Sequence, residues 1–191
     1  MKKNKTSPQS IIFDTTIVLG IDYSYKEVGL AILYKGSVEY VDRINFQLIE
    51  AKNNVKLRKK HRRAILRKKV DSLVNAYHVT AIIVERIRLF SRGFVSMPTI
   101  IALGELIAAI IDAVPDALPV FSTETRVWKK RIHGNASAQK QDTVKWAQQH
   151  MTISLFMQRG ERSFTHNEAD ALALAFFAYH ADAPRFLKRE E

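Results

Sequence analysis

The sequence predicts an α/β domain built on a mixed five-stranded sheet with helices on both faces. Three short β-rich runs follow one another in the first quarter of the chain, and two later apolar runs alternate with helical patterns. With 191 residues, 47% of them hydrophobic, the chain is long enough to bury a substantial core. We therefore expect residues 17–191 to form one domain, preceded by a flexible basic arm over residues 1–16.

The first half of the chain contains four predicted strands and one long predicted helix. Lys35-Gly36-Ser37 is a turn sequence between the second and third strands, which favours a hairpin. The long helix carries an apolar face at helical spacing that can dock on a sheet. The expected strands are 17–22, 27–34, 38–48 and 81–85, and the expected helix is 52–77.

The second half is mostly helical. An apolar helix is expected over 97–113, where Gly104 would allow close packing, and a short fifth strand over 118–121. Ser137 is a candidate N-cap for a later helix that runs to about His150. The remaining helices are expected at 123–133 and 167–181.

The charge balance points to a polyanionic partner. The chain has 30 Lys and Arg residues against 19 Asp and Glu residues, which gives a net charge of +11. Such an excess favours nucleic acid or an anionic membrane surface, but no apolar stretch approaches the roughly 18 to 20 residues that span a bilayer. Cysteine is absent, which excludes disulfides, thiolate nucleophiles and cysteine-type zinc sites. We expect a cytoplasmic protein with no membrane partner.

Three carboxylates stand in unusually apolar surroundings. Asp22 and Glu85 each end an apolar run, and Asp170 lies in a segment otherwise suited to a buried helix. Buried charges persist mainly when they are paired or hold a metal, so the three acids predict a cage for two Mg²⁺ ions that activate a water molecule. The alternative is separate structural roles, with Glu85 paired to an arginine and Asp170 favouring the helix dipole.

Two residues before the last acid are further candidate ligands. His166 and Asn167 precede Asp170 by four and three residues, so a helix places all three on one face. Either could supply a fourth ligand, and His166 could move protons. Asn167 could equally cap the helix. Glu168 is expected to support the helix N-terminus.

Four segments, in order, resemble one nuclease family. VLGIDYSYKEVGLAIL is similar to the first strand and hairpin of RuvC-type Holliday-junction resolvases, which belong to the RNase H-like superfamily. AIIVERIRLF resembles the second acidic segment of that family, and HNEADALALA resembles its last helix. VFSTETRVWKKRIHGNASAQKQDTV is similar to its basic segment. The resemblance runs from about residue 17 to 180 and implies an RNase H-like fold.

The resemblance implies roles for individual residues. It places the family's metal-binding acids at Asp22, Glu85 and Asp170. The remaining family ligand falls on Asn167, a weaker neutral ligand for which His166 is the substitute. Lysines that contact DNA phosphate near the scissile bond fall on Lys129 and Lys140, and Lys140 could also stabilise developing charge. The implied catalytic set is Asp22, Glu85, Asn167, Asp170 and Lys140.

Two segments are candidate DNA contacts. Ten Lys or Arg residues lie between Lys52 and Lys69 without one acid, and each phosphate contact would add salt-dependent affinity, although a charge run can also be only a solvated face. The basic, aromatic loop 86–96 places Arg88 where the family often has an aromatic wedge, and Phe90 could stack on an unpaired base or pack on its own domain. The expected contacts are Lys56, Arg58, Lys59, Arg62, Arg63, Arg88, Phe90, Lys129 and Lys140.

These features together predict a structure-selective endodeoxyribonuclease that cuts four-way junctions, and other branched DNA, with Mg²⁺ or Mn²⁺. The resemblance implies products with a 5′-phosphate and a two-fold homodimer, for which helix 97–113 is the candidate interface. The rich basic stretch suggests a divergent, bacteriophage-encoded member. The alternatives are an RNase H-type ribonuclease that cuts RNA in hybrids and a non-catalytic branched-DNA-binding protein, which the amide at Asn167 favours.

Overall fold

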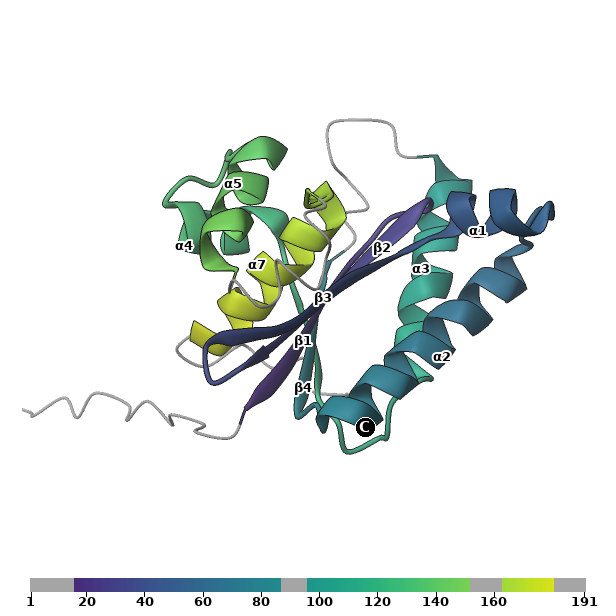
Figure 1. Ribbon diagram of the computed structural model, residues 1–191, viewed down its shortest axis with the longest axis horizontal. Helices are drawn as coiled ribbons and strands as arrows, with labels where there is room; N and C mark the ends of the chain where they lie inside the picture. The colour runs from purple at the N-terminus through teal and green to yellow at the C-terminus, as the bar shows by residue number, and fades with distance from the viewer. Residues whose placement is uncertain (1–15, 87–95, 152–162, 181–191) are drawn as a thin grey trace, which may run out of the picture.

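A mixed five-stranded sheet forms the centre of the molecule (Figure 1). The computed structural model describes residues 16–86, 96–151 and 163–180. The strand order is β3-β2-β1-β4-β5; the first three strands pair antiparallel, and β1, β4 and β5 pair parallel. The predicted sheet is therefore confirmed. Its strands are β1 (Ile17–Tyr23), β2 (Glu27–Tyr34), β3 (Ser37–Asn45), β4 (Ala81–Glu85) and β5 (Val120–Thr123).

Helices cover both faces of the sheet, as Figure 1 shows. One face packs on α2 and α3 through a cluster that contains Leu66 and Leu106. The other face packs on α4, α5 and α7, where the long apolar side of α7 lies across β1 and β2. The described helices are α1 (Phe46–Asn53), α2 (Lys59–Tyr77), α3 (Met97–Ile111), α4 (Thr125–His133), α5 (Lys140–His150) and α7 (His166–His180). No described helix has the length and apolar character needed to cross a membrane.

Two glycines let α7 lie unusually close to the sheet. A Cβ atom on Gly20 of β1 would collide with the backbone carbonyl of Ala171, and one on Gly29 of β2 would collide with the carbonyl of Asn167. Glycine inside a strand often marks such a close approach of another backbone. The contact brings the first turns of α7, which carry Asp170, down onto the strands.

The helix predicted over 52–77 begins later, as α2 at Lys59, and a separate short helix, α1, precedes it. The third strand ends at Asn45, whose side-chain oxygen accepts a hydrogen bond from the backbone N–H of Leu48 at 3.0 Å and so caps α1. Asn54 then ends α1 in the left-handed conformation, with φ of 47°. The prediction of a strand through residue 48 was wrong because this cap starts a helix within an apolar run.

Several finer predictions were also wrong. A Cβ atom on Gly104 would meet no other atom within 4 Å, so this glycine does not serve close packing within the domain. The N-cap of α5 is Gln139, which forms a capping box with Asp142, in place of Ser137. The fifth strand lies at Val120–Thr123, slightly later than expected. The predicted arm falls outside the described residues except for its last position.

Candidate active site

The sheet brings Asp22 and Glu85 to the same face. Side chains alternate along a strand, and in β1 Leu19 and Ile21 face the α2–α3 cluster, so Asp22 faces α7. In β4 Val84 faces the α2–α3 cluster, so Glu85 also faces α7. Ile21 pairs with Val84 in the parallel register, and the two acids are the next residues along each strand. Both therefore lie at the carboxyl ends of neighbouring strands, where open α/β sheets place their sites.

Asp170 completes the group from α7, and the three carboxyls influence one another. Burial raises the pKa of Asp22 well above its usual value, and Asp170 and Glu85 raise it further. Burial also raises the pKa of Asp170 to about 6; Lys129 and Lys140 oppose this shift, and Glu85 adds to it. The three acids therefore lie near enough to one another to interact electrostatically.

The donor set suits a hard divalent cation. Asp170 Oδ1 is buried without a hydrogen-bond partner among the described residues, and a buried acceptor without a partner is normally satisfied by water or an ion. Carboxylate oxygens are the ligands that Mg²⁺ prefers. Within residues 16–86, 96–151 and 163–180, however, no three Asp, Glu or His side chains already stand in a metal-binding arrangement. The three carboxyls therefore interact electrostatically without already forming a metal-binding arrangement among the described residues.

Glu85 is held by two neutral donors from α4. The hydroxyl of Thr125 donates to Glu85 Oε1 at 2.6 Å, and the indole Nε1 of Trp128 donates to Oε2 at 2.9 Å. The hydroxyl of Tyr23 donates to the backbone carbonyl of Glu85 at 2.7 Å. None of these three donors was identified from the sequence. One available signal was Trp128, because a buried indole N–H needs an acceptor.

Both lysines of the basic segment lie near the acids. Lys129 and Lys140 each lower the pKa of Asp170, and Lys140 also lowers that of Asp22. Lys129 Nζ donates to the carbonyl of Ala138 at 2.7 Å, which ties α4 to the segment before α5. Lys140 is the exposed first residue of α5. Lys140 thus lies near Asp22 and Asp170, and Lys129 lies near Asp170.

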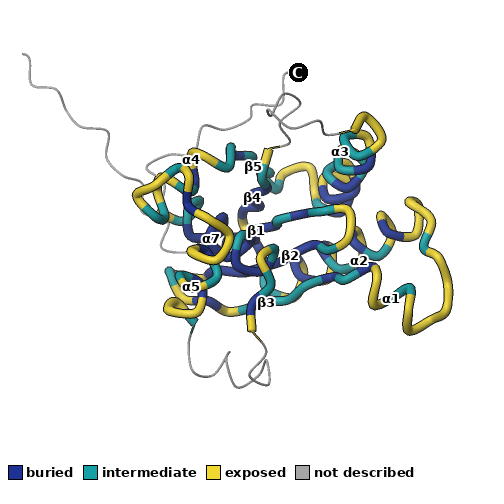
Figure 2. Tube along the Cα trace, turned by 90° about the horizontal axis from the view of Figure 1, so that it is seen from above, coloured by how far each residue is buried: buried dark blue, intermediate teal, exposed yellow. Residues whose placement is uncertain are grey.

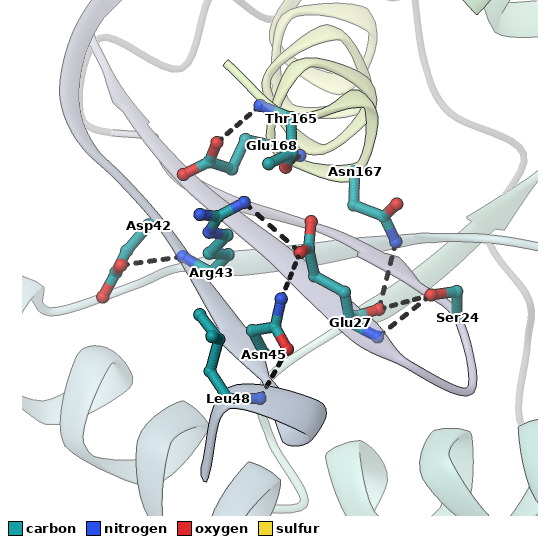
Figure 3. Close-up of polar contacts among 9 residues, drawn as sticks. All are labelled: Ser24, Glu27, Asp42, Arg43, Asn45, Leu48, Thr165, Asn167 and Glu168. Atoms are coloured by element: carbon teal, nitrogen blue, oxygen red, sulfur yellow. Dashed lines mark hydrogen bonds and ion pairs between the residues drawn. The ribbon is translucent and has the colours of Figure 1, made fainter. Parts of the chain in front are cut away.

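Asn167 does not cap α7, because the helix already begins at His166. Its amide Nδ2 instead donates to the carbonyl of Glu27 at 3.0 Å, at the start of β2 (Figure 3). Figure 3 also shows Glu27 receiving hydrogen bonds from Asn45, at 3.1 Å, and Arg43, at 3.4 Å. The amide is therefore fixed against the sheet, whereas His166 is exposed.

Thr165 and Glu168 provide the N-terminal cap of α7. The backbone N–H of Thr165 donates to Glu168 Oε2 at 2.7 Å, and the N–H of Glu168 donates to Thr165 Oγ1 at 3.3 Å. This reciprocal pair is a capping box. The expectation that Glu168 supports the helix N-terminus is confirmed.

Arg62 differs from the other cations of the basic stretch because it is buried, with 8% of its surface exposed. Its guanidinium donates to the carbonyl of Tyr25 at 2.8 Å and pairs with Glu50 at 2.8 Å. It also lies over the rings of Tyr25 and Phe46. The expectation that Arg62 contacts DNA does not fit this environment, because its charge is used inside the protein.

The other four predicted contacts in this stretch are exposed: Lys56, Arg58, Lys59 and Arg63. Figure 2 shows α1 and the segment that follows it as largely exposed. The bond from Arg62 to Tyr25, three residues after Asp22, places the start of α2 at the same end of the sheet as the acids.

Some cations of the basic stretch 52–69 are paired with acids, although the stretch itself contains no acid. Acids from other elements contact some of its cations: Asp42 lies 3.0 Å from Lys69, and Glu105 lies 3.9 Å from Lys59. The two loop contacts, Arg88 and Phe90, lie outside the described residues.

Comparison with protein families gives one match over most of the chain. The family described as crossover junction endodeoxyribonuclease RuvC matches residues 18–178. No curated protein matches the chain.

Three solved structures share the fold. Thermus thermophilus RuvC in complex with a Holliday junction substrate aligns with a TM-score of 0.65 and 18% identity, covering 88% of this chain and 98% of that one. A second Thermus thermophilus RuvC structure aligns with a TM-score of 0.60 and 20% identity, covering 88% of this chain and 99% of that one. The yeast mitochondrial Holliday junction resolvase Ydc2 aligns with a TM-score of 0.53 and 15% identity, covering 87% of this chain and 78% of that one.

Proposed function

Because this chain belongs to the RuvC family of crossover junction endodeoxyribonucleases, we propose that it cuts four-way DNA junctions with divalent cations held by Asp22, Glu85 and Asp170. The observation that supports this most is the meeting of three acids at the ends of β1 and β4 and on α7, with the pKa of Asp22 and of Asp170 raised. A site that gathers like charges in a chain of net charge +11 favours cations and a polyanion together.

The residues divide the work of phosphodiester hydrolysis. Bound Mg²⁺, for which Mn²⁺ is the proposed substitute, would activate a water for in-line attack and neutralise the leaving oxygen. Asp22 and Asp170 would bind as carboxylates, and Glu85 is already oriented by its two donors. Lys140 and Lys129 would contact the phosphate near the scissile bond, where Lys140 stabilises developing charge. The product carries a 5′-phosphate.

Asn167 is our choice for the fourth ligand. Its Nδ2 is used by the Glu27 carbonyl, which leaves the amide oxygen available for a cation. His166 is the alternative, and its exposure suits a residue that exchanges protons with solvent.

DNA arms would lie along the exposed cations at the start of α2. Lys56, Arg58, Lys59 and Arg63 are the contacts we retain, and each phosphate that they neutralise strengthens binding at low salt. Arg88 and Phe90, in the segment after Glu85, remain proposed contacts.

We also propose that the protein is encoded by a bacteriophage and acts in the cytoplasm.

We propose a two-fold homodimer in which α3 forms the interface, because two active sites are needed to cut a junction symmetrically. One face of α3 carries an apolar stripe whose members follow one another at alternating spacings of four and three residues: Met97, Ile101, Gly104, Ala108 and Ile111. Its three large members are exposed, Met97 by 66%, Ile101 by 50% and Ile111 by 40%. Gly104 and Ala108 lie between them and are not buried in the core. Such a stripe is typical of a helix–helix seam.

Substitution of the acids tests the catalytic proposal. Asp22→Asn and Glu85→Gln keep the shape of each side chain and remove its charge, so each should abolish junction cleavage while retaining junction binding. Cleavage of a labelled four-way junction and a gel-shift assay measure the two properties. Wild-type cleavage rates in both variants would rule out the metal-cage proposal.

The neutral amide at Asn167 supports one second candidate, a protein that binds branched DNA without cutting it. Intact junction binding with no cleavage in either Mg²⁺ or Mn²⁺ would establish that function instead.

A further inference from the structure

We infer that Thr125 and Trp128 are positioning residues that orient the Glu85 carboxylate for the cation. This inference rests on the proposed function, because it assigns how one proposed ligand is held. Both carboxylate oxygens are occupied by these donors, at 2.6 Å from the Thr125 hydroxyl and 2.9 Å from the Trp128 indole. Each oxygen can accept more than one hydrogen bond or ligand, so both keep a lone pair for a metal ion.

The two donors are rigidly placed. Thr125 and Trp128 are three residues apart at the start of α4, so they lie on one face of the helix. Trp128 is fully buried in the core beneath α7. The start of α4 is in turn anchored to the end of β4, since Thr123 of β5 pairs with Glu85 and its carbonyl accepts from the N–H of Arg86 at 2.7 Å.

The chemistry of the donors also suits this role. A hydroxyl and an indole N–H are neutral, so they stabilise a carboxylate without placing a positive charge beside the cation. An arginine in the same place would compete with the metal for the carboxylate. Metal ligands are commonly oriented by such outer contacts, whose loss costs about 10- to 100-fold in metal affinity.

The test compares variants that differ by one donor. Thr125→Val removes the hydroxyl at nearly constant volume, and Thr125→Ser restores a hydroxyl. Trp128→Phe removes the indole N–H that Glu85 accepts. Trp146→Phe is its control, because the second tryptophan of the chain packs on the rings of His133, His150 and Phe176. Thermal unfolding of each variant establishes that it is folded.

Calorimetric titration with Mn²⁺ measures the affinity for the cation, and Asp22→Asn is the reference variant that should lose this binding. The Mg²⁺ concentration that gives half-maximal junction cleavage is a second measure of cation affinity. We expect Thr125→Val and Trp128→Phe to lower the Mn²⁺ affinity and raise the required Mg²⁺ concentration, each by about tenfold or more. Thr125→Ser and Trp146→Phe should resemble wild type in both measurements. Unchanged Mn²⁺ affinity in folded Thr125→Val and Trp128→Phe would overturn this inference alone. A wild-type protein that binds no Mn²⁺ and cuts no junction would overturn the proposed function as well.

Discussion

At the scale of single residues, the ionised Asp170 carboxyl destabilises the protein when no cation is bound. Its pKa is raised from 3.8 to about 6, chiefly by burial. Between these values the folded chain binds more protons than the unfolded chain, so the free energy of unfolding falls as the pH rises and the loss is complete above about pH 6. A shift of about two units corresponds to roughly 3 kcal/mol. A bound cation offsets this cost because it requires the ionised form.

Asp170→Asn should therefore stabilise the metal-free protein while it abolishes cleavage. Urea unfolding in EDTA at pH 8 should give a free energy of unfolding about 2–3 kcal/mol above wild type, because the variant buries no charge. At pH 5, where the wild-type carboxyl is largely protonated in the folded state, the gain should fall to about half.

The exposed Asp112 provides the control for that experiment. Asp112→Asn should give no comparable gain at either pH. A variant Asp170→Asn that is less stable than wild type at pH 8 would contradict the assignment of a costly buried charge.

The three acids were predictable from sequence, but the groups around them were not. Asp22 and Glu85 end apolar runs, and that local pattern alone indicated strand ends with a charge. Thr125 and Trp128 lie about forty residues beyond Glu85, and only the pairing of β4 with β5 brings them to it. Arg62 was misassigned because its acidic partner, Glu50, lies outside the charge run.

At the scale of elements, the start of α2 combines a structural cation with cations that are exposed to solvent and can contact DNA. Arg62 joins α2 to α1 and to the turn after β1, through Glu50 and Tyr25. Its neighbour Arg63 is exposed. Adjacent arginines on one helix thus have different predicted functions.

Arg63→Ala should weaken junction binding and leave stability nearly unchanged. Loss of one phosphate contact should reduce the slope of log affinity against log salt by about 1. Arg62→Ala should instead lower the free energy of unfolding, because it removes a buried guanidinium that packs on Tyr25 and Phe46 and leaves the Tyr25 carbonyl without its donor. Binding titrations at several salt concentrations and urea unfolding separate the two. An unchanged salt slope in Arg63→Ala would contradict the proposed DNA contact.

Element types were predicted better than element boundaries. Ten of the described elements follow from periodicity, whereas α1 was missed. Its start and end depend on Asn45 and Asn54, whose capping and left-handed conformations are set by local hydrogen bonds within an otherwise continuous pattern.

At the scale of the whole molecule, the exposed apolar stripe of α3 is the surface that we propose joins two copies. Ile101→Glu should give a monomer, because it places a charge in the centre of the stripe. Val127→Glu is a matched control, since Val127 on α4 has the same exposed fraction of 50% as Ile101. Sedimentation velocity measures the oligomeric state. A dimer that persists in Ile101→Glu would contradict the assignment of α3 as the interface.

The central claim is that this fold cuts branched DNA with a metal ion held by three acids. The most direct test incubates the wild-type protein with a labelled four-way junction, an RNA–DNA hybrid and a linear duplex, each with Mg²⁺ and with EDTA. We predict cleavage of the junction alone, only with Mg²⁺, at symmetrically placed sites that carry 5′-phosphates. Cleavage of the RNA strand of the hybrid with the junction left intact would contradict the claim.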